Sequence, residues 1–301
     1  IFVAGHNGMV GSATLNELKK KSNQLLYESR KSLDLENEER VLEWFNYNKP
    51  QIVIIAAATV GGIYANSNYP VDFIENNLRI QNNIIRSSYI TGVEKLVFLG
   101  SSCIYPKYSQ QPIKEDYLLS GYLEPTNEAY AIAKIAGLKL CSYLFKEYNK
   151  DFITIMPTNL YGPNDNFDLK TSHVLAALIN KINYAKKYKK KSVEIWGTGK
   201  PKRDFLHVND LADAVCFLAE NYSASEPINV GSSKEISIKE LAEMIAKLVG
   251  WYGTFLFNKS MPDGTMLKKL DTTKINNLGW HPKIDIKTGI KQTIKEYEKS
   301  L

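Results

Sequence analysis

Four reactive side chains stand at spacings that could bring them to one site. Ser101 and Cys103 directly follow an apolar run, residues 95–100, which is typical of a buried strand. Tyr130 and Lys134 lie four residues apart, so in a helix they share one face. A phenol can donate a proton, a hydroxyl can polarise a carbonyl, and a thiol can accept a proton as thiolate. The set therefore predicts acid–base chemistry at the carboxyl edge of a sheet, where open α/β sheets bind ligands.

The N-terminus carries a second functional signal. Residues 1–4 are apolar and lead into Gly5, Asn7, Gly8, Met9, Val10 and Gly11 within the pattern G-x-x-G-x-x-G. A helical pattern follows. Glycines in such a loop allow a tight turn, close approach of a diphosphate, and close helix–strand packing. Strand, loop and helix stand in the order of a dinucleotide site.

The next predicted strand, residues 25–27, ends near residues that discriminate between coenzymes. An acid such as Glu28 suits the ribose hydroxyls of NAD, whereas Arg30 suits the 2′-phosphate of NADP. Both types are present, and we favour NADP.

The other elements predict an α/β fold with a doubly wound parallel sheet. Residues 51–58, 96–100 and 152–156 read as strands, and residues 70–89 and 127–149 as helices. Gly61 and Gly62 are expected to leave room for a flat ligand. We predict a dinucleotide-binding domain over 1–160, joined by part of 193–222. A smaller substrate lobe is predicted over 161–192 and 223–301, with a capping box at Ser237 and Glu240.

Composition narrows the class of protein. The 301 residues are 44% hydrophobic with a net charge of +6, much of it in residues 186–191, which we interpret as a solvated run. No nucleic-acid module is evident. The longest apolar run, residues 52–63, is too short to span a membrane. Three scattered cysteines and four histidines show no disulfide or metal pattern and favour the cytoplasm.

With Ser101 about thirty residues before Y-x-x-x-K, the chain resembles the extended short-chain dehydrogenase/reductase superfamily. Segments 100–106, 123–128 and 156–163 look like those of the GDP-L-fucose synthase family. The resemblance covers nearly the whole chain. It implies a Rossmann fold, NADP, a GDP-sugar substrate, and 3,5-epimerisation of GDP-4-keto-6-deoxy-D-mannose followed by 4-reduction. It also implies a homodimer through helices 72–89 and 130–146.

The resemblance assigns roles to individual residues. Ser101, Tyr130 and Lys134 would serve reduction, and Cys103 and His173 would move protons in epimerisation. Cofactor contacts are expected, beyond the glycine loop, from Arg30, Asp34, Leu99, Lys134, Pro157, Asn159, Leu160 and His173. Substrate contacts are expected from Ser101, Asn159, Lys181, Trp196, Arg203 and Asp263. His207, Cys141 and Cys216 are interpreted as structural.

One departure and three alternatives remain. Family members often carry Arg in the glycine loop where this chain has Asn7, so the preference for NADP over NAD is predicted to be relaxed. The same residues would suit a GDP-4-keto-6-deoxy-heptose 4-reductase. They would also suit an NDP-sugar 4-epimerase with bound NAD, which would not need Cys103 and His173. A dinucleotide sensor without catalysis would be expected to lack part of the catalytic set.

Overall fold

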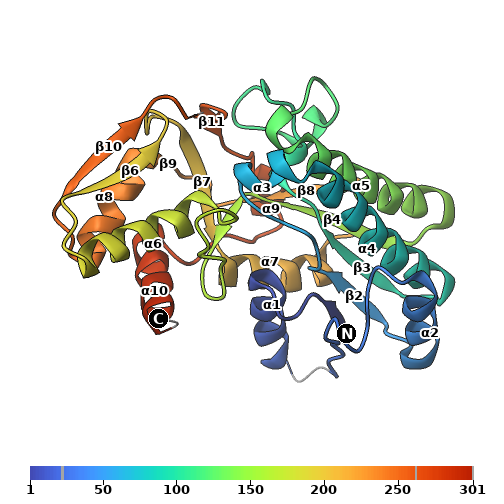
Figure 1. Cartoon of the computed structure of the whole chain (residues 1–301). Coiled ribbons are helices and arrows are strands. Elements are labelled where there is room, and N and C mark those ends of the chain that lie inside the picture. The colour runs from blue at the N-terminus through green and yellow to red at the C-terminus, as the bar shows by residue number, and fades with distance from the viewer. Residues whose placement is uncertain (22–23, 262, 300–301) are drawn as a thin grey trace.

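The computed structural model describes residues 1–21, 24–261 and 263–299. Its main sheet has five parallel strands in the order β1-β2-β3-β4-β8 (Figure 1). The predicted α/β class with a parallel sheet is confirmed.

The strands, in chain order, are β1 (Phe2–Ala4), β2 (Ile52–Ile55), β3 (Lys95–Leu99), β4 (Asp151–Pro157), β5 (Asn159–Tyr161), β6 (Ser192–Trp196), β7 (Lys202–His207), β8 (Ile228–Val230), β9 (Glu235–Ser237), β10 (Thr254–Asn258) and β11 (Leu267–Lys268). The α-helices are α1 (Met9–Lys19), α2 (Glu38–Asn48), α3 (Ile63–Asn68), α4 (Pro70–Ile90), α5 (Glu128–Tyr148), α6 (Val174–Lys187), α7 (Val208–Asn221), α8 (Ile238–Val249), α9 (Thr273–Asn277) and α10 (Ile286–Lys299). Three 3-10 turns are η1 (Ser102–Ile104), η2 (Glu115–Tyr117) and η3 (Pro125–Asn127).

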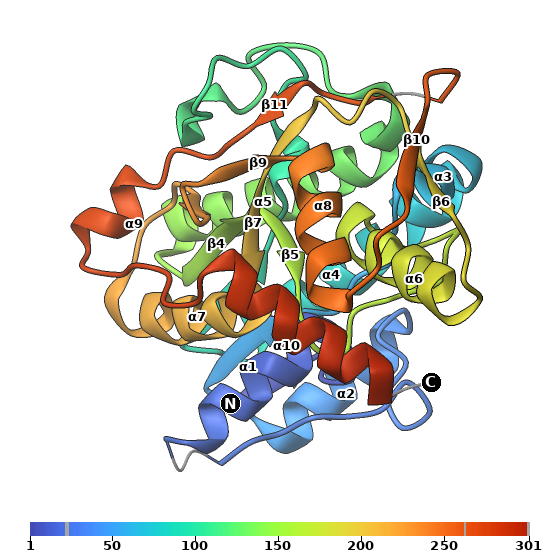
Figure 2. The same ribbon diagram turned by 90° about the vertical axis from the view of Figure 1, so that its left-hand side faces the viewer.

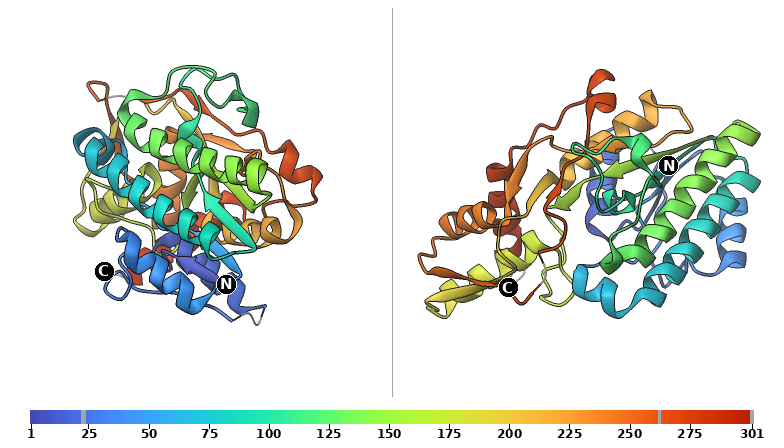
Figure 3. Two further views of the ribbon diagram at one scale, coloured as in Figure 1. Left: turned by 90° about the vertical axis from the view of Figure 1, so that its right-hand side faces the viewer. Right: turned by 90° about the horizontal axis from the view of Figure 1, so that it is seen from above.

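The main sheet is apolar on both faces because alternate residues of each strand pack on opposite layers. Val53 and Phe98 belong to a core with α2, α4 and α5, whereas Ile54 and Val97 belong to a core with α1 and α7. Figure 3 shows α4 and α5 side by side on the outside of the first layer. Burial on both faces explains why these strands read as continuous β-branched runs.

The strand predicted over residues 25–27 is reduced to one bridge. Leu26 pairs with Phe2, donating to Ile1 and accepting from Val3 at 2.8 and 3.0 Å. The segment thus covers the edge of β1 without extending into a strand of its own.

The second lobe packs α6, α8 and α10 against short strands (Figure 2). Ser237 and Glu240 form the predicted capping box at the start of α8. The lobe holds the pairs β6–β10 and β7–β11, both parallel. The solvated run 186–191 is exposed throughout, as predicted.

The chain returns to the main sheet after the lobe has begun. α7 packs on α1, and β8 pairs with β4, so the returning stretch reaches past residue 222. The main chain joins the two parts again where Ile113 bonds to Lys269 and Asp271, each at 2.8 Å. The lobe boundaries given above stay a prediction, and residues 300 and 301 lie outside the described chain.

Candidate active site

The end of β3 forms a tight turn that presents Ser101 and Cys103. Ser101 is the N-cap of η1, and its Oγ accepts a hydrogen bond from the Cys103 amide at 3.2 Å. This local bond fixes the serine and the cysteine relative to each other. The two residues therefore face one site from a single turn.

Helix α5 brings Tyr130 and Lys134 to this turn. Lys134 is buried, with Nζ donating to the Leu99 carbonyl at 2.9 Å and lying 5.9 Å from the centre of the Tyr130 ring. The Ser101 side chain lies near the Tyr130 phenol and acts to lower the pKa of that phenol. The structure thus brings the predicted serine, tyrosine and lysine together, while their roles remain predictions.

Burial changes the acidity of both α5 side chains. It raises the pKa of the Tyr130 phenol, an effect to which the nearby Cys103 adds and which Ser101 opposes. Burial lowers the pKa of Lys134 to about 7. The phenol therefore carries its proton at neutral pH and is available as a donor.

Lys268 is a site residue that the sequence reasoning missed. Its Nζ donates to Cys103 Sγ at 3.4 Å. Burial raises the pKa of the thiol, but Lys268, Ser101 and Arg203 together outweigh burial, so the pKa of Cys103 is lowered. Lys268 stands in a polar segment whose sequence has neither strand nor helix periodicity. The pairing of β11 with β7, which sets Lys268 opposite Arg203, is what shows that it belongs to the site.

His173 reaches the same region from the start of α6, where it is the N-cap residue. The Gly62 amide donates to Thr171 at 2.8 Å, and a Cβ on Gly62 would lie 2.5 Å from the Ser172 carbonyl. Gly62 therefore admits the loop before His173, rather than a flat ligand as predicted. His173 is an exposed residue, but the protein atoms around it displace enough water to lower the pKa of its imidazole. The positive charge of Lys268 lowers this pKa further.

The glycine loop fits a dinucleotide. Gly8 is the N-cap of α1, and no side chain caps this helix, so its first N–H groups suit a diphosphate. A Cβ on Gly11 would lie 2.1 Å from the Gly5 carbonyl oxygen, whereas one on Gly8 would lie at 3.5 Å. Gly11 thus serves loop–helix packing, and the surface at Gly8 stays open.

The coenzyme-discriminating side chains have partners on neighbouring loops. Glu28 accepts a bond from Trp44 Nε1 at 3.4 Å, and Arg30 pairs with Glu36 at 2.8 Å. The Arg30 side chain is 80% exposed, which leaves it free to reorient toward an anion. Asp34 accepts from the Glu36 amide at 3.1 Å and so orders this loop.

The other predicted cofactor residues lie at or just after the carboxyl ends of β3 and β4. Leu99 ends β3, Pro157 ends β4, and Asn159 and Leu160 begin β5. The Asn159 amide donates to the Asp204 carbonyl at 2.9 Å. These positions share the carboxyl edge of the sheet with Ser101.

Four of the predicted substrate residues lie on α6, β6, β7 and the loop before β11. Trp196 ends β6 and is 40% exposed, with Lys181 Nζ 5.6 Å from its ring. Arg203 on β7 is partly buried and donates to the Lys202 carbonyl. Both carboxylate oxygens of Asp263 accept bonds from Thr198, at 2.6 and 2.9 Å. Asp263 therefore orders its loop, and its predicted sugar contact would require it to give up one of these bonds.

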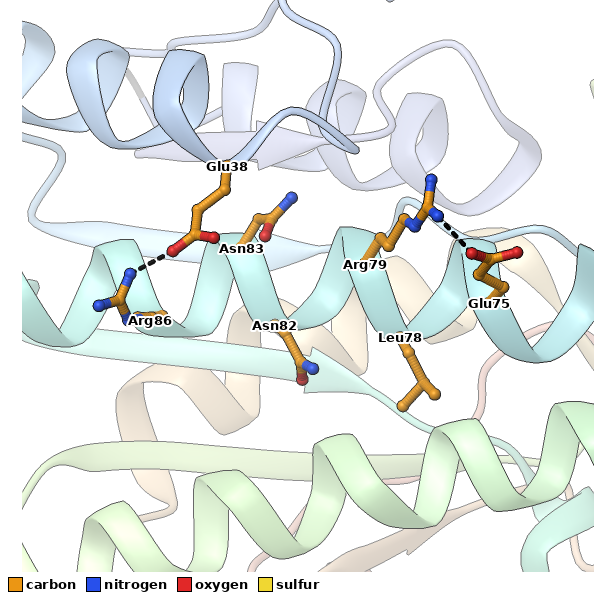
Figure 4. Close-up of a pocket in the computed structure, with 7 residues that line it drawn as sticks. All are labelled: Glu38, Glu75, Leu78, Arg79, Asn82, Asn83 and Arg86. Atoms are coloured by element: carbon orange, nitrogen blue, oxygen red, sulfur yellow. Dashed lines mark hydrogen bonds and ion pairs between the residues drawn. The ribbon is translucent and has the colours of Figure 1, made fainter.

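A shallow pocket elsewhere is unsuited to the substrate. Figure 4 shows it between α4 and α2, where Arg79 pairs with Glu75 and Arg86 pairs with Glu38. Its arginines are already neutralised by these carboxylates. In the described ranges, no group of His, Cys, Asp and Glu has a metal-binding arrangement, and no helix is long and apolar enough to cross a membrane.

Known proteins share this framework. A family model described as "NAD dependent epimerase/dehydratase family" matches residues 1–231. The chain belongs to that family. Within the family, it is 52% identical over 298 residues to putative GDP-L-fucose synthase 2 of Arabidopsis thaliana, covering 99% of this chain and 91% of that protein. The resemblance predicted from the sequence is thereby confirmed.

Two solved structures superpose on 99–100% of this chain. A GDP-6-OMe-4-keto-L-xylo-heptose reductase from C. jejuni gives a TM-score of 0.94 at 38% identity, covering 100% of this chain and 97% of that one. A GDP-L-fucose synthetase from Naegleria fowleri bound to NADP gives 0.90 at 29% identity, covering 99% and 94%. The chain is thus similar to proteins named for two different GDP-sugars.

Proposed function

We propose that this chain converts GDP-4-keto-6-deoxy-D-mannose to GDP-L-fucose with NADPH. Epimerisation at the two ring carbons beside the ketone would precede reduction of the 4-keto group. The supporting observation is the turn after β3, where Ser101 accepts a hydrogen bond from the Cys103 amide and also acts on the pKa of the Tyr130 phenol. The 52% identity to a putative GDP-L-fucose synthase supports the choice of sugar.

Reduction would use the α5 side chains. Tyr130, protonated at neutral pH, would donate its proton to the oxygen of the former ketone, and Ser101 would hydrogen-bond the same oxygen. Lys134 would hold the ribose of the coenzyme and favour proton loss from the phenol. NADPH, when bound, supplies the hydride.

The coenzyme would lie along the carboxyl edge of the main sheet. The glycine loop and the start of α1 would hold its diphosphate, and Arg30 would contact the 2′-phosphate after leaving Glu36. Because Asn7 offers no charge, we infer a relaxed preference for NADP over NAD. Steady-state kinetics with both coenzymes tests this, and a preference for NADPH above about a hundredfold would contradict it.

Epimerisation would use Cys103 and His173. Protons beside the ketone are acidic because the negative charge left behind spreads onto the carbonyl oxygen. A thiolate at Cys103 would remove such a proton from one side, and His173 would return one from the other side. The lowered pKa of Cys103 supports its role as the base.

Arg203 and Lys181 would bind the GDP diphosphate, and Trp196 would stack on a planar group. The partial burial of Arg203 and its position beside Cys103 support a phosphate contact close to the reacting sugar. Asn159 and Asp263 would contact the sugar or nucleotide.

The test is incubation with GDP-4-keto-6-deoxy-mannose and NADPH in deuterium oxide, followed by NMR of the product. We expect NADPH oxidation, deuterium at both carbons flanking the ketone, and the L-fucose configuration. A Cys103→Ala variant is expected to keep reduction of an already epimerised ketone and to lose epimerisation. Absence of NADPH oxidation by the wild type would reject the reductase.

A second candidate is the corresponding heptose reductase, which the TM-score of 0.94 to the C. jejuni enzyme favours. A heptose has one carbon more than a hexose, so the two substrates differ in the chain that the sugar ring carries. Competition between the hexose and heptose substrates, measured as the ratio of kcat/KM, separates the candidates.

We further propose a homodimer through α4 and α5 and a cytoplasmic location. Val71 and Ile132 are exposed apolar residues on these adjacent helices, at 66% and 44%. The small residue Gly137 instead faces inward, since a Cβ there would meet Phe98 and Gln81. The three cysteines are free, which fits a reducing compartment. Light scattering in solution measures the dimer, and a monomer would contradict it.

A further inference from the structure

Lys268 is placed at the site by strand pairing rather than by chance approach of a surface side chain. β11 pairs in parallel with β7, and Lys268 stands opposite Arg203. Its Nζ donates to Cys103 Sγ at 3.4 Å across 165 residues of sequence. A lysine in this register meets the thiol whenever β11 is paired.

The backbone on both sides of Lys268 is anchored. On the N-terminal side, the Lys202 amide donates to Met266 at 2.8 Å. On the C-terminal side, the Lys269 amide donates to Gln111 Oε1 at 2.9 Å, and the Lys269 carbonyl accepts from Ile113 at 2.8 Å. The backbone that carries Lys268 is therefore fixed, and the hydrogen bond to Cys103 Sγ places its ammonium.

The groups facing Cys103 come from several elements. Lys268 approaches from β11, Arg203 from β7, Tyr130 from α5, and Ser101 from the same turn. The carboxylates of Asp263 and Glu124 also act on Arg203, where they raise the pKa of the guanidinium. Lys268 is the cation with a direct hydrogen bond to the sulfur, and its charge also acts on His173.

We propose that Lys268 sets the protonation of the epimerisation pair, holding Cys103 as a thiolate and making the His173 imidazolium a stronger acid. The inference rests on the proposed roles of Cys103 and His173. An ammonium in contact with sulfur favours the thiolate, the form that removes protons. The same charge disfavours a second cation at His173, which eases donation of its proton.

The first experiment needs no turnover. The rate at which iodoacetamide alkylates Cys103 is measured against pH, with Cys103→Ala as the background. For the wild type we expect the alkylation rate to reach its midpoint at a pH below the pKa of an ordinary thiol. In Lys268→Met we expect the rate at neutral pH to fall about tenfold, which corresponds to a midpoint one pH unit higher. Lys268→Arg should restore the rate, and Lys269→Met, one residue away, should leave it unchanged.

The second experiment separates electrostatic control from substrate binding. Epimerisation is measured as the uptake of deuterium from the solvent. In Lys268→Met, both limbs of its pH–rate profile should move to higher pH. Reduction of an already epimerised ketone should keep its profile. A higher KM with unchanged midpoints would show a phosphate-binding lysine and overturn the proposal.

The outcomes remain separable from the proposed function. If the wild type does not epimerise the sugar but the midpoint of Cys103 alkylation still depends on Lys268, the proposed function is wrong. The effect of the Lys268 charge on Cys103 would then still hold. If Lys268→Met does not fold, Lys268→Gln, which also removes the charge, takes its place. A wild-type value at or above that of a free cysteine would refute the proposal.

Discussion

Replacing Lys134 with methionine is expected to remove a pH-dependent part of the protein's stability. The amine is 3% exposed and donates to the Leu99 carbonyl at 2.9 Å. Burial lowers its pKa to about 7 from the ordinary 10.5. Between these values the unfolded chain binds a proton that the folded protein lacks, so stability rises with pH.

The size of the effect follows from the two pKa values. Each pH unit between them changes the free energy of unfolding by up to about 1.4 kcal/mol, and the rise from pH 7 to pH 9 comes to roughly 2 kcal/mol. Below about pH 7 both states are protonated and this contribution is constant. Methionine does not titrate, so the variant should lack the rise.

The assay is urea unfolding of wild type and Lys134→Met at several pH values from 6 to 9. We expect the wild type to gain stability relative to the variant above pH 7. Lys146→Met, at an exposed position of the same helix, is the control and should track the wild type. A wild-type-to-variant difference that stays constant from pH 7 to pH 9 would show that the buried amine does not titrate near neutrality.

Three further substitutions test the coenzyme site. Gly11→Ala should destabilise the protein by about 1–3 kcal/mol, because its Cβ would meet the Gly5 backbone at 2.1 Å, whereas Gly8→Ala should spare stability and weaken NADPH binding. Thermal unfolding and fluorescence titration measure these effects, and equal stability of the two variants would contradict the packing role of Gly11. Glu36→Gln should release Arg30 and lower the KM for NADPH by up to about fivefold, the limit for an exposed ion pair, without changing that for NADH. An equal change for both coenzymes would show that Arg30 does not contact the 2′-phosphate.

The sequence was sufficient to predict the sheet because its central strands are buried on both faces. Runs such as residues 52–55 and 95–99 carry that burial in their composition. The segment 25–27 has the same apolar character but lies at the edge beside β1, where a single bridge satisfies it. Local composition does not record how many partners a strand has.

The candidate site was predictable where its residues follow strands or share a helix face, as Ser101, Tyr130 and Lys134 do. Lys268 was not, because its position depends on β11 pairing with β7. The hydrogen bonds that Asp263 accepts from Thr198 and the pair between Arg30 and Glu36 were likewise missed, since each depends on how a side chain in one loop reaches another segment.

The bonds between Ile113 and the segment 269–271 also bear on the order of events during synthesis. Cys103 leaves the ribosome 165 residues before Lys268, and until β11 is in place it lacks that ammonium. A thiol without a nearby cation stays largely protonated and reacts slowly with oxidants. If Lys268 holds Cys103 as a thiolate, as proposed, the nascent chain would be shielded from oxidative damage at Cys103, and the vulnerable thiolate would arise only when the last part of the chain has joined the first.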